Sequence, residues 1–215
     1  MEKTTFLLIR HGESQANKEQ IFGGHYDAPL TESGLEQARI TGRFIQENYK
    51  VHKVYASDLK RAYVTGSTIA EIVGAEIVPE PGLREIFGGE WEGKKYTQIQ
   101  EKYEEAFRIW KTRTGRARCT GGESVSELGK RIMDTLHRIA EENPGETIVI
   151  ATHATPVRVM QCLVEKGTLE EMEHTPWVSN ASVTELIYKN GKWTLGKIGM
   201  DAHLSEHRTT LPDTV

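Results

Sequence analysis

An arginine and a histidine stand next to each other at Arg10 and His11, directly behind the apolar run 5–9. A planar guanidinium offers several hydrogen-bond donors to phosphate oxygens. A neutral imidazole nitrogen can attack phosphorus and form a covalent phosphohistidine. The pair therefore indicates chemistry on a phosphoryl group, although an Arg-His pair behind a strand also arises by chance.

Two further basic side chains follow other apolar runs. Arg61 lies in the first turn of a helix predicted behind the run 53–57, and His153 closely follows the run 147–151. In an α/β sheet, the carboxyl ends of the parallel strands and the helix starts beyond them converge on one crevice. We therefore expect both side chains to join the Arg-His pair. A solvated arginine and an ordinary loop histidine are the alternatives.

A phosphoryl transfer also needs a group that protonates the leaving oxygen, and a carboxylic acid can supply that proton. Glu85 and Glu90 lie in the glycine-rich stretch 83–93 and both qualify chemically, although surface positions are favoured for Glu90 and Glu92. The amide of Asn17, on the turn behind the Arg-His pair, is close enough in sequence to touch the same anion.

The 215 residues are 37% hydrophobic and 27% charged, with a formal net charge of -4, which is typical of a soluble globular protein. A mildly acidic chain is a poor match for nucleic acid, whose partners usually carry a basic excess. No run approaches the roughly 20 apolar residues that cross a bilayer, and the N-terminus shows no signal-like apolar region. We therefore expect a cytoplasmic protein with neither a nucleic-acid nor a membrane partner, and leave open whether it forms a homodimer.

Apolar runs alternate with helical periodicity along most of the chain. Strands are predicted at 5–9, 53–57, 75–78 and 147–151, with a closing hairpin at 183–195. Helices are predicted from 31 past 45 and at 58–74, 96–111, 123–142 and 156–164. The alternation predicts an α/β fold, a three-layer sandwich with a mostly parallel central sheet flanked by helices. We expect one domain over 1–204, with an elaborated cap region at about 81–122 and a loose C-terminal tail at 205–215.

Several motifs, taken in order along the chain, resemble the histidine phosphatase superfamily, the phosphoglycerate mutase-like proteins. The similarity extends to about residue 204, and the order of the motifs makes it far more specific than any one of them. It implies the phosphoglycerate mutase-like fold. The motifs that carry the resemblance lie at 10–17, 27–38, 57–62, 83–93, 122–124 and 151–153.

The resemblance also implies roles for individual side chains. His11 would be the nucleophile that becomes phosphorylated, and Glu85 would protonate the leaving oxygen and then deprotonate the attacking water. No metal or other cofactor is implied, because cationic side chains stabilise the phosphoryl charge. The residues implied to hold the phosphoryl group are Arg10, Arg61, His153 and Asn17.

The superfamily contains phosphatases and mutases that share these core residues. The mutases that depend on 2,3-bisphosphoglycerate carry a longer insertion after the acid, which includes a Glu-Arg-His-Tyr-Gly run. This chain lacks that run and has residues 91–96 in its place. We therefore expect a metal-independent phosphomonoesterase that hydrolyses small phosphorylated metabolites through a phosphohistidine on His11. The alternatives are a bisphosphoglycerate-dependent mutase and a non-catalytic phosphate-binding relative.

Residues for the rest of the substrate are harder to predict. Phe22, Gly23 and Gly24 fall where the superfamily's substrate-contacting loop lies, and the glycine N–H groups could bind a substrate oxygen. The basic stretch 111–118 either reaches over the pocket to a second anionic group or is a solvated loop. Three aromatic residues are predicted either to form pocket walls or to pack in the core: Trp91, Tyr26 and Phe107.

Overall fold

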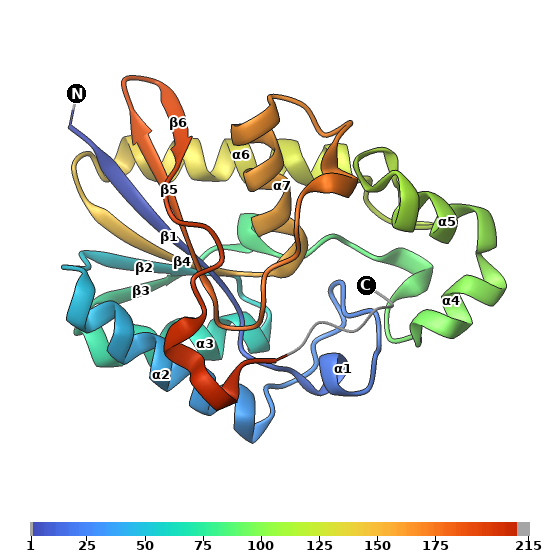
Figure 1. Ribbon diagram of the computed structural model, residues 1–215, viewed down its shortest axis with the longest axis horizontal. Coiled ribbons are helices and arrows are strands. Elements are labelled where there is room, and N and C mark those ends of the chain that lie inside the picture. Colours follow the sequence, from blue (N-terminus) through green and yellow to red (C-terminus); the bar gives the residue numbers. More distant parts are fainter. Residues whose placement is uncertain (1, 210–215) are drawn as a thin grey trace.

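A six-stranded mixed sheet forms the centre of the computed structural model, which describes residues 2–209 (Figure 1). Its strands lie in the order β3-β2-β4-β1-β5-β6. The first four are parallel, whereas β5 runs antiparallel to β1 and β6 antiparallel to β5. The sheet is therefore mostly parallel, as predicted. The strands are β1 (Thr4–Arg10), β2 (Lys53–Ala56), β3 (Glu76–Pro79), β4 (Thr147–Thr152), β5 (Val183–Lys189) and β6 (Lys192–Leu195).

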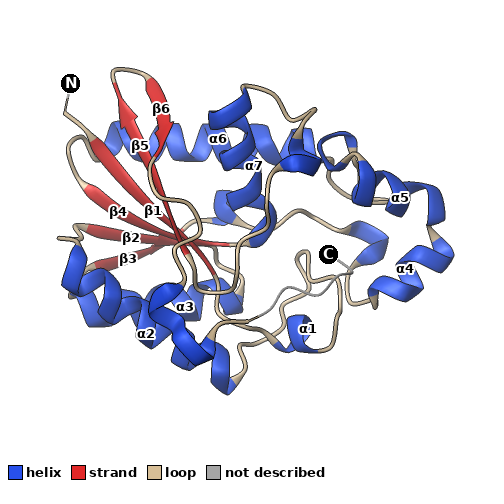
Figure 2. Cartoon of the chain, viewed as in Figure 1, coloured by secondary structure: helices blue, strands red, loops and turns tan. Residues whose placement is uncertain are grey.

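Helices cover both faces of this sheet, which gives the predicted three layers (Figure 2). Successive side chains of a strand point to opposite faces. Leu8 of β1 accordingly packs with residues of α6 and α7, while Leu7 and Ile9 pack with residues of α2 and α3. Because both faces are buried, the middle of the strand, residues 6–9, is apolar throughout. The helices are α1 (Gln15–Lys18), α2 (Glu32–Asn48), α3 (Lys60–Val73), α4 (Tyr96–Lys102), α5 (Glu104–Thr112), α6 (Val125–Glu142) and α7 (Ala154–Lys166).

The ends of these helices follow from capping residues. The hydroxyl of Thr31 accepts a hydrogen bond from the Gly34 N–H at 3.0 Å, so α2 begins behind the predicted cap. Ser124 and Glu127 form a reciprocal capping box at the start of α6. Gly74 ends α3 with a φ of 71°, in the left-handed region that glycine adopts without a steric penalty.

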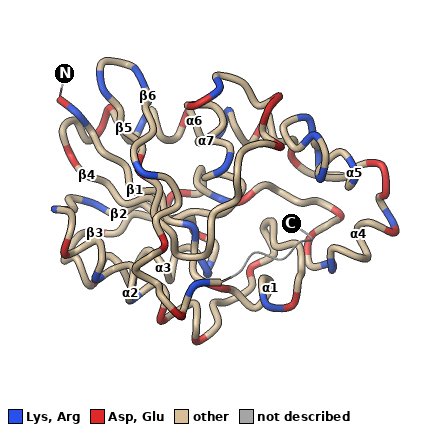
Figure 3. Tube along the Cα trace, viewed as in Figure 1, with Lys and Arg blue, Asp and Glu red and all other residues tan. Residues whose placement is uncertain are grey.

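The cap region at about 81–122 contains α4, α5 and several 3-10 turns. The single helix predicted over 96–111 is wrong, because the chain breaks at Tyr103, where φ is -128° and ψ is 44°. The two helices project beyond the end of the sheet, and acidic and basic residues are interleaved along them (Figures 1 and 3).

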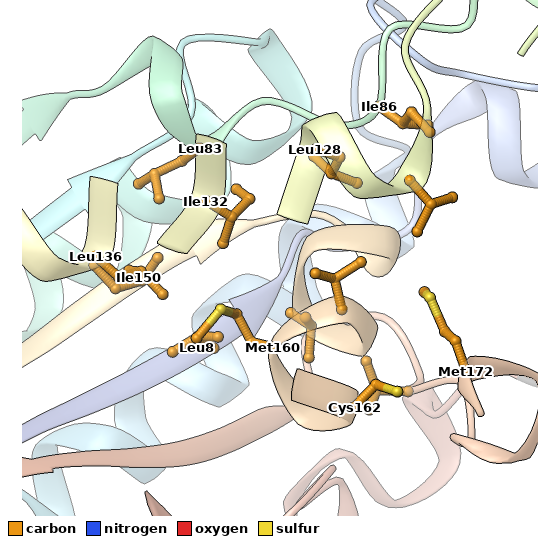
Figure 4. Packing of buried hydrophobic residues seen from close by; sticks show 14 of the residues in the cluster. Leu8, Leu83, Ile86, Leu128, Ile132, Leu136, Ile150, Met160, Cys162 and Met172 are labelled. Atoms are coloured by element: carbon orange, nitrogen blue, oxygen red, sulfur yellow. The ribbon is translucent and has the colours of Figure 1, made fainter. Parts of the chain in front are cut away.

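The cap shares its hydrophobic core with the α6–α7 face of the sheet. Leu83 and Ile86 from the start of the cap lie in one cluster with Leu128 and Ile132 of α6 and with Met160 of α7 (Figure 4). All five side chains are at most 1% exposed, and complete burial of such a side chain stabilises a fold by roughly 1.5–3 kcal/mol. The cap is therefore held to the sheet by its own apolar side chains.

The carboxyl ends of β1, β2 and β4 reach the same edge of the sheet. Arg10 is in register with Thr152, and Ala56 is in register with Ala151. The residues that follow these strands therefore leave the sheet side by side. This register brings together the segments that carry the predicted site residues.

The C-terminal segment crosses α2 after the β5–β6 hairpin. A 3-10 segment, Ala202–His207, places the carbonyl of His207 where it accepts a hydrogen bond from Gln37 Nε2 at 2.7 Å. Thr209 Oγ1 donates to Asn180 Oδ1 at 3.0 Å. Residues 205–209 of the predicted loose tail are therefore anchored, and 210–215 lie outside the described residues. Over 2–209, no helix combines the length and apolar character needed to cross a membrane.

Candidate active site

His11 is held as a neutral ring by its two hydrogen-bond partners. Its Nδ1 lies 2.7 Å from the carbonyl oxygen of Gly12, and its Nε2 lies 3.2 Å from Nε of Arg61. A carbonyl can only accept and a guanidinium can only donate, so Nδ1 carries the hydrogen and Nε2 carries the lone pair. Burial, together with the charges of Arg61 and Arg10, lowers the pKa of His11 well below its ordinary range. The ring is therefore unprotonated at neutral pH.

Arg61 leaves the first turn of α3 and reaches His11 from the side. Its Nη1 donates to the carbonyl of Tyr26 at 2.9 Å, and its Nη2 donates to the carbonyl of Gly24 at 2.7 Å. The side chain is 2% exposed. The guanidinium therefore joins the nucleophile to the loop at 23–26.

Arg10, the last residue of β1, supplies a second buried cation. Its Nη1 donates to the carbonyl of Val178 at 2.6 Å, while its Nε is buried without a hydrogen-bond partner among residues 2–209. Burial lowers the pKa of Arg10 to about 10, so the side chain is still charged at neutral pH. An unpaired buried donor beside a neutral imidazole is typical of a site that receives a polar ligand.

His153 lies directly behind His11, just after the end of β4. Its ring centroid is 5.1 Å from that of His11, in an edge-to-face arrangement, and its Nε2 is 2.8 Å from the hydroxyl of Ser57. The ring is fully buried, and burial followed by the charge of Arg61 lowers the pKa of His153 well below its ordinary range. Its Nδ1 has no hydrogen-bond partner in the described part of the chain.

The carboxylate of Glu85 is fixed by backbone N–H groups on the opposite side of the site. Its Oε1 accepts from the N–H of Ile86 at 2.8 Å, and its Oε2 accepts from the N–H of Thr155, in the first turn of α7, at 3.3 Å. These contacts hold the carboxylate against the helix that follows His153.

Arg131 of α6 holds the loop that carries Glu85. Its guanidinium donates to the carbonyl oxygens of Gly82, Arg84 and Glu85 at 2.9 to 3.2 Å. It is itself paired with both carboxylate oxygens of Glu123, at 3.0 and 2.9 Å. Such two-pronged pairing fixes the plane of a guanidinium. Sequence reasoning missed this side chain, because nothing in a helical arginine indicates which loop it will reach.

The loop that carries His11 packs backbone to backbone on the start of α2. A Cβ atom at Gly12 would lie 2.2 Å from the carbonyl oxygen of Gly34, and one at Gly34 would lie 2.0 Å from the carbonyl oxygen of Glu13. No side chain fits at either position. The two glycines therefore allow the close approach that sets the height of the nucleophile above the sheet.

Asn17 has its amide oxygen fully engaged. The oxygen accepts from the N–H and the hydroxyl of Ser14, both at 3.1 Å, and from Nδ2 of Asn180 at 3.2 Å. With the oxygen so fixed, the amide NH₂ is available to donate to a ligand. Asn180 also donates to the backbone oxygen of His11 at 3.0 Å.

A cavity of about 320 Å³ lies between the side chains of Arg10, His11, Asn17, Arg61 and Glu85. His153 does not line it, because this ring lies behind His11. Residues that were not predicted also contribute to its wall, namely Tyr96, Trp110, Trp177, Asn180 and Arg208. The predicted residues that line it are Arg10, His11, Asn17, Phe22, Gly23, Gly24, Arg61 and Glu85.

Comparison with protein families identifies the chain. The sequence profile of the histidine phosphatase superfamily (branch 1) matches residues 6–201. The chain belongs to this superfamily. Relatives of the chain in this superfamily are named as phosphatases and as mutase-like proteins. The chain is therefore an enzyme of the phosphatase or mutase class.

Individual members of the histidine phosphatase superfamily resemble the chain over nearly its whole length. Phosphoserine phosphatase 1 of Hydrogenobacter thermophilus is 29% identical over 93% of this chain and 94% of the relative. Phosphoglycerate mutase-like protein 4 of Arabidopsis thaliana is 32% identical over 93% of this chain and 86% of the relative. The solved structure of Bacillus stearothermophilus YhfR, 27% identical, superposes with a TM-score of 0.89 and covers 94% of this chain and 100% of its own. The predicted fold is thereby confirmed.

In this member of the superfamily, the loop at 22–26 is held by an acid that was predicted to lie at the surface. Oε1 of Glu92 accepts from the N–H groups of His25 and Gly88, at 2.7 and 2.9 Å. The surface position favoured for Glu92 is wrong, because backbone N–H groups from two loops converge on its carboxylate. Glu90 lies at the surface as predicted, where it accepts from the hydroxyl of Tyr103.

For the three aromatic residues predicted either to form pocket walls or to pack in the core, the packing alternative holds for two, and the third lies at the surface. Trp91 and Phe107 are 0% and 5% exposed and pack in the core, while Tyr26 is 48% exposed, and none of the three lines the cavity. The stretch 111–118 does not line the cavity either, and two of its arginines form exposed ion pairs with Glu170 and Glu127. The solvated alternative is therefore the correct one for these arginines. Within 2–209, no cluster of three His, Cys, Asp or Glu side chains is arranged to hold a metal.

Proposed function

We propose that this histidine phosphatase is a metal-independent phosphomonoesterase that hydrolyses small phosphorylated metabolites through a phosphohistidine on His11. The single observation that carries the proposal is the neutral His11 ring, with Nδ1–H donated to Gly12 and the Nε2 lone pair facing Arg61. A nucleophile at phosphorus needs an available lone pair and a cation beside it.

In the first step, Nε2 of His11 attacks phosphorus, and the bond from phosphorus to the ester oxygen breaks. As the Nε2 lone pair of His11 forms the bond to phosphorus, the Nε–H of Arg61 stops donating to the His11 ring. It donates a hydrogen bond to a phosphoryl oxygen instead. Arg10 binds the other phosphoryl oxygens, and Asn17 donates from its amide. Protonated Glu85 gives its proton to the leaving oxygen, so that an alcohol departs.

In the second step, water hydrolyses the phosphohistidine. The Glu85 carboxylate takes a proton from the water as the water oxygen attacks phosphorus. The bond from phosphorus to Nε2 then breaks, which releases phosphate and restores the neutral His11 ring. His153 is fully buried behind His11, and its edge-to-face contact supports the His11 ring.

A phosphoenzyme assay tests the nucleophile. Brief incubation with a labelled phosphomonoester should give a phosphoenzyme that is labile in acid and stable in base, as a phosphoramidate bond requires. The substitution His11→Ala should abolish the label, while His52→Ala, which changes a histidine outside the cavity, should retain it. Label that survives His11→Ala refutes the proposed nucleophile.

Metal independence is tested separately. Hydrolysis of p-nitrophenyl phosphate should be unchanged after exhaustive treatment with EDTA, because two arginines rather than a metal neutralise the phosphoryl charge. Loss of turnover that a divalent cation restores would contradict this part of the proposal.

A mutase is the second candidate, favoured by the 32% identity to a phosphoglycerate mutase-like protein. It would return the phosphoryl group from His11 to a sugar-acid oxygen instead of water, with 2,3-bisphosphoglycerate as the priming cofactor. Interconversion of 2- and 3-phosphoglycerate, measured with and without bisphosphoglycerate, distinguishes the two reactions. A non-catalytic relative would show neither reaction, but it would have no use for an acid at Glu85.

A further inference from the structure

A phenol that the proposed reaction does not use opens into the catalytic cavity. Tyr96, the first residue of α4, lines the same cavity as Arg10 and Glu85. Its side chain is partly buried, and its hydroxyl makes no hydrogen bond to any residue in 2–209. The hydroxyl is therefore available to bond to a ligand in the cavity.

The ring of Tyr96 is fixed by aromatic neighbours. It packs edge to face against Phe22, with centroids 6.0 Å apart, and lies at a tilt to Phe107 at 6.3 Å. Its backbone N–H donates to the carbonyl of Gln20 at 3.2 Å, which ties the start of α4 to the segment before the loop at 22–26. With backbone and ring both held, the hydroxyl has a fixed position in the cavity wall.

The electrostatic surroundings of the phenol decide what it can do there. Burial raises the pKa of Tyr96 to about 12, partly offset by the positive charge of Arg10 and reinforced by the negative charge of Glu85. The hydroxyl therefore keeps its proton at neutral pH and is a poor general acid. The phenol shares the wall of the cavity with Arg10 and His11.

We propose that Tyr96 is a further catalytic residue, whose hydroxyl donates a hydrogen bond to a phosphoryl oxygen beside the one bound by Arg10. The inference rests on the proposed function, because it places a phosphoryl group between Arg10 and His11. A neutral donor at this point stabilises the charge that moves onto the phosphoryl oxygens without adding another buried cation.

The substitution Tyr96→Phe tests the hydrogen bond, because it removes only the hydroxyl and keeps the ring against Phe22 and Phe107. A hydrogen bond to a charged group typically contributes enough to make its loss a roughly 10- to 100-fold effect. We expect kcat/KM to fall by about that factor, equally for p-nitrophenyl, phenyl and alkyl phosphates, because the contact is to the group that all three share. The affinity for orthovanadate and for inorganic phosphate should also fall.

Tyr103→Phe is the matched control. It removes a tyrosine hydroxyl from the same cap, one that bonds to Glu90 at the surface and lies outside the cavity. This variant should keep wild-type kinetics and wild-type phosphate affinity. Thermal unfolding of both variants, with and without phosphate, checks that each is folded.

Two results overturn the inference. In the first, Tyr96→Phe matches the wild type in turnover and in calorimetric affinity for inorganic phosphate. In the second, the loss of turnover grows with the pKa of the leaving group while phosphate affinity is unchanged, which places the hydroxyl at the leaving group. Phosphate affinity can be measured without turnover, so it tests the hydrogen bond even if the wild type hydrolyses no phosphomonoester. A wild type without hydrolytic activity would count against the proposed function alone.

Discussion

The Nε atom of Arg61 lies 3.2 Å from the Nε2 atom of His11, so one guanidinium orients the His11 ring and also depresses its pKa. The same guanidinium is bonded to the carbonyls of Gly24 and Tyr26. Its position is therefore set by the loop that borders the cavity. A change in that loop reaches the protonation of His11 through a single side chain.

Replacing Arg61 by glutamine should raise the pKa of His11 toward its ordinary value, because a neighbouring positive charge is lost. The acid limb of the pH–rate profile should move to higher pH, and kcat/KM should fall by roughly 10- to 200-fold, as expected for one hydrogen bond to a charged group. NMR titration of the His11 ring measures the shift. Arg43→Gln, in an exposed ion pair with Glu36, is the control, and an unmoved His11 titration in Arg61→Gln contradicts the assignment.

The substitution Glu85→Gln should lower kcat by roughly 100- to 10,000-fold, the range typical of a lost general acid. Inorganic phosphate should bind nearly as well as before, since the acid acts in the transition state. The loss should be smaller for p-nitrophenyl phosphate than for an alkyl phosphate, whose leaving oxygen needs the proton more. Glu90→Gln, at the surface, should change neither quantity. Equal losses for both substrates would argue against proton donation.

Stability should fall in mild acid because of the buried histidines. Burial lowers the pKa of His11, His153 and His203 in the folded state, whereas the unfolded chain has ordinary values near 6.5. Above pH 6.5 the three rings are neutral in both the folded and the unfolded state. Below that pH only the unfolded chain protonates them, until the pH reaches their folded-state pKa values. Each ring should then remove roughly 1.4 kcal/mol of unfolding free energy per pH unit.

Urea unfolding at pH 7.5, 6.5 and 5.5 measures this dependence. His11→Asn should reduce the change in stability between pH 6.5 and 5.5 by the share of one ring, about 1 kcal/mol, because the unfolded ring is only half protonated at pH 6.5. An unchanged slope would mean that His11 is already protonated in the folded protein, which is incompatible with its proposed role as nucleophile.

Arg131→Gln should destabilise the fold by about 2–3 kcal/mol, because several carbonyls of the acid-bearing loop and the carboxylate of Glu123 lose their donor. The partial exposure of the pair, 27% and 14%, keeps the effect below that of a fully buried ion pair. Lys130→Gln, on the exposed side of α6 and paired with Asp134, should change stability by less than about 0.5 kcal/mol. Chemical denaturation of the two variants makes the comparison, and equal midpoints would show that the loop does not depend on Arg131.

The sequence predicted the strand-end residues of the site well. Arg10 ends one buried parallel strand, His153 follows another, and Arg61 lies in the first turn of the helix behind a third, so the register of the sheet brings them together. This inference needs only the rule that such ends meet at one edge. Glu85 lies at no strand end. Its assignment to the site came from the resemblance of its motif to the superfamily.

Asn180 was missed for a physical reason. It lies before β5, and β5 is antiparallel to β1, so its starting end, not its carboxyl end, reaches the catalytic edge. A search limited to carboxyl ends passes over it. Glu92 and Tyr96 were missed differently, because their importance depends on how the cap folds back on the loop at 22–26, and short irregular segments leave no periodic signal.

The segment before β5 also sets when the enzyme can become active. The carbonyl of Val178 binds Arg10, Asn180 binds the backbone of His11, and the N–H of Ala181 bonds to the carbonyl of Arg10 at 2.9 Å. Arg10 and its partner Val178 are 168 residues apart in the sequence. During synthesis the Arg-His pair therefore emerges from the ribosome long before the segment that positions it, and a nascent chain that stops short of residue 181 carries His11 without that segment.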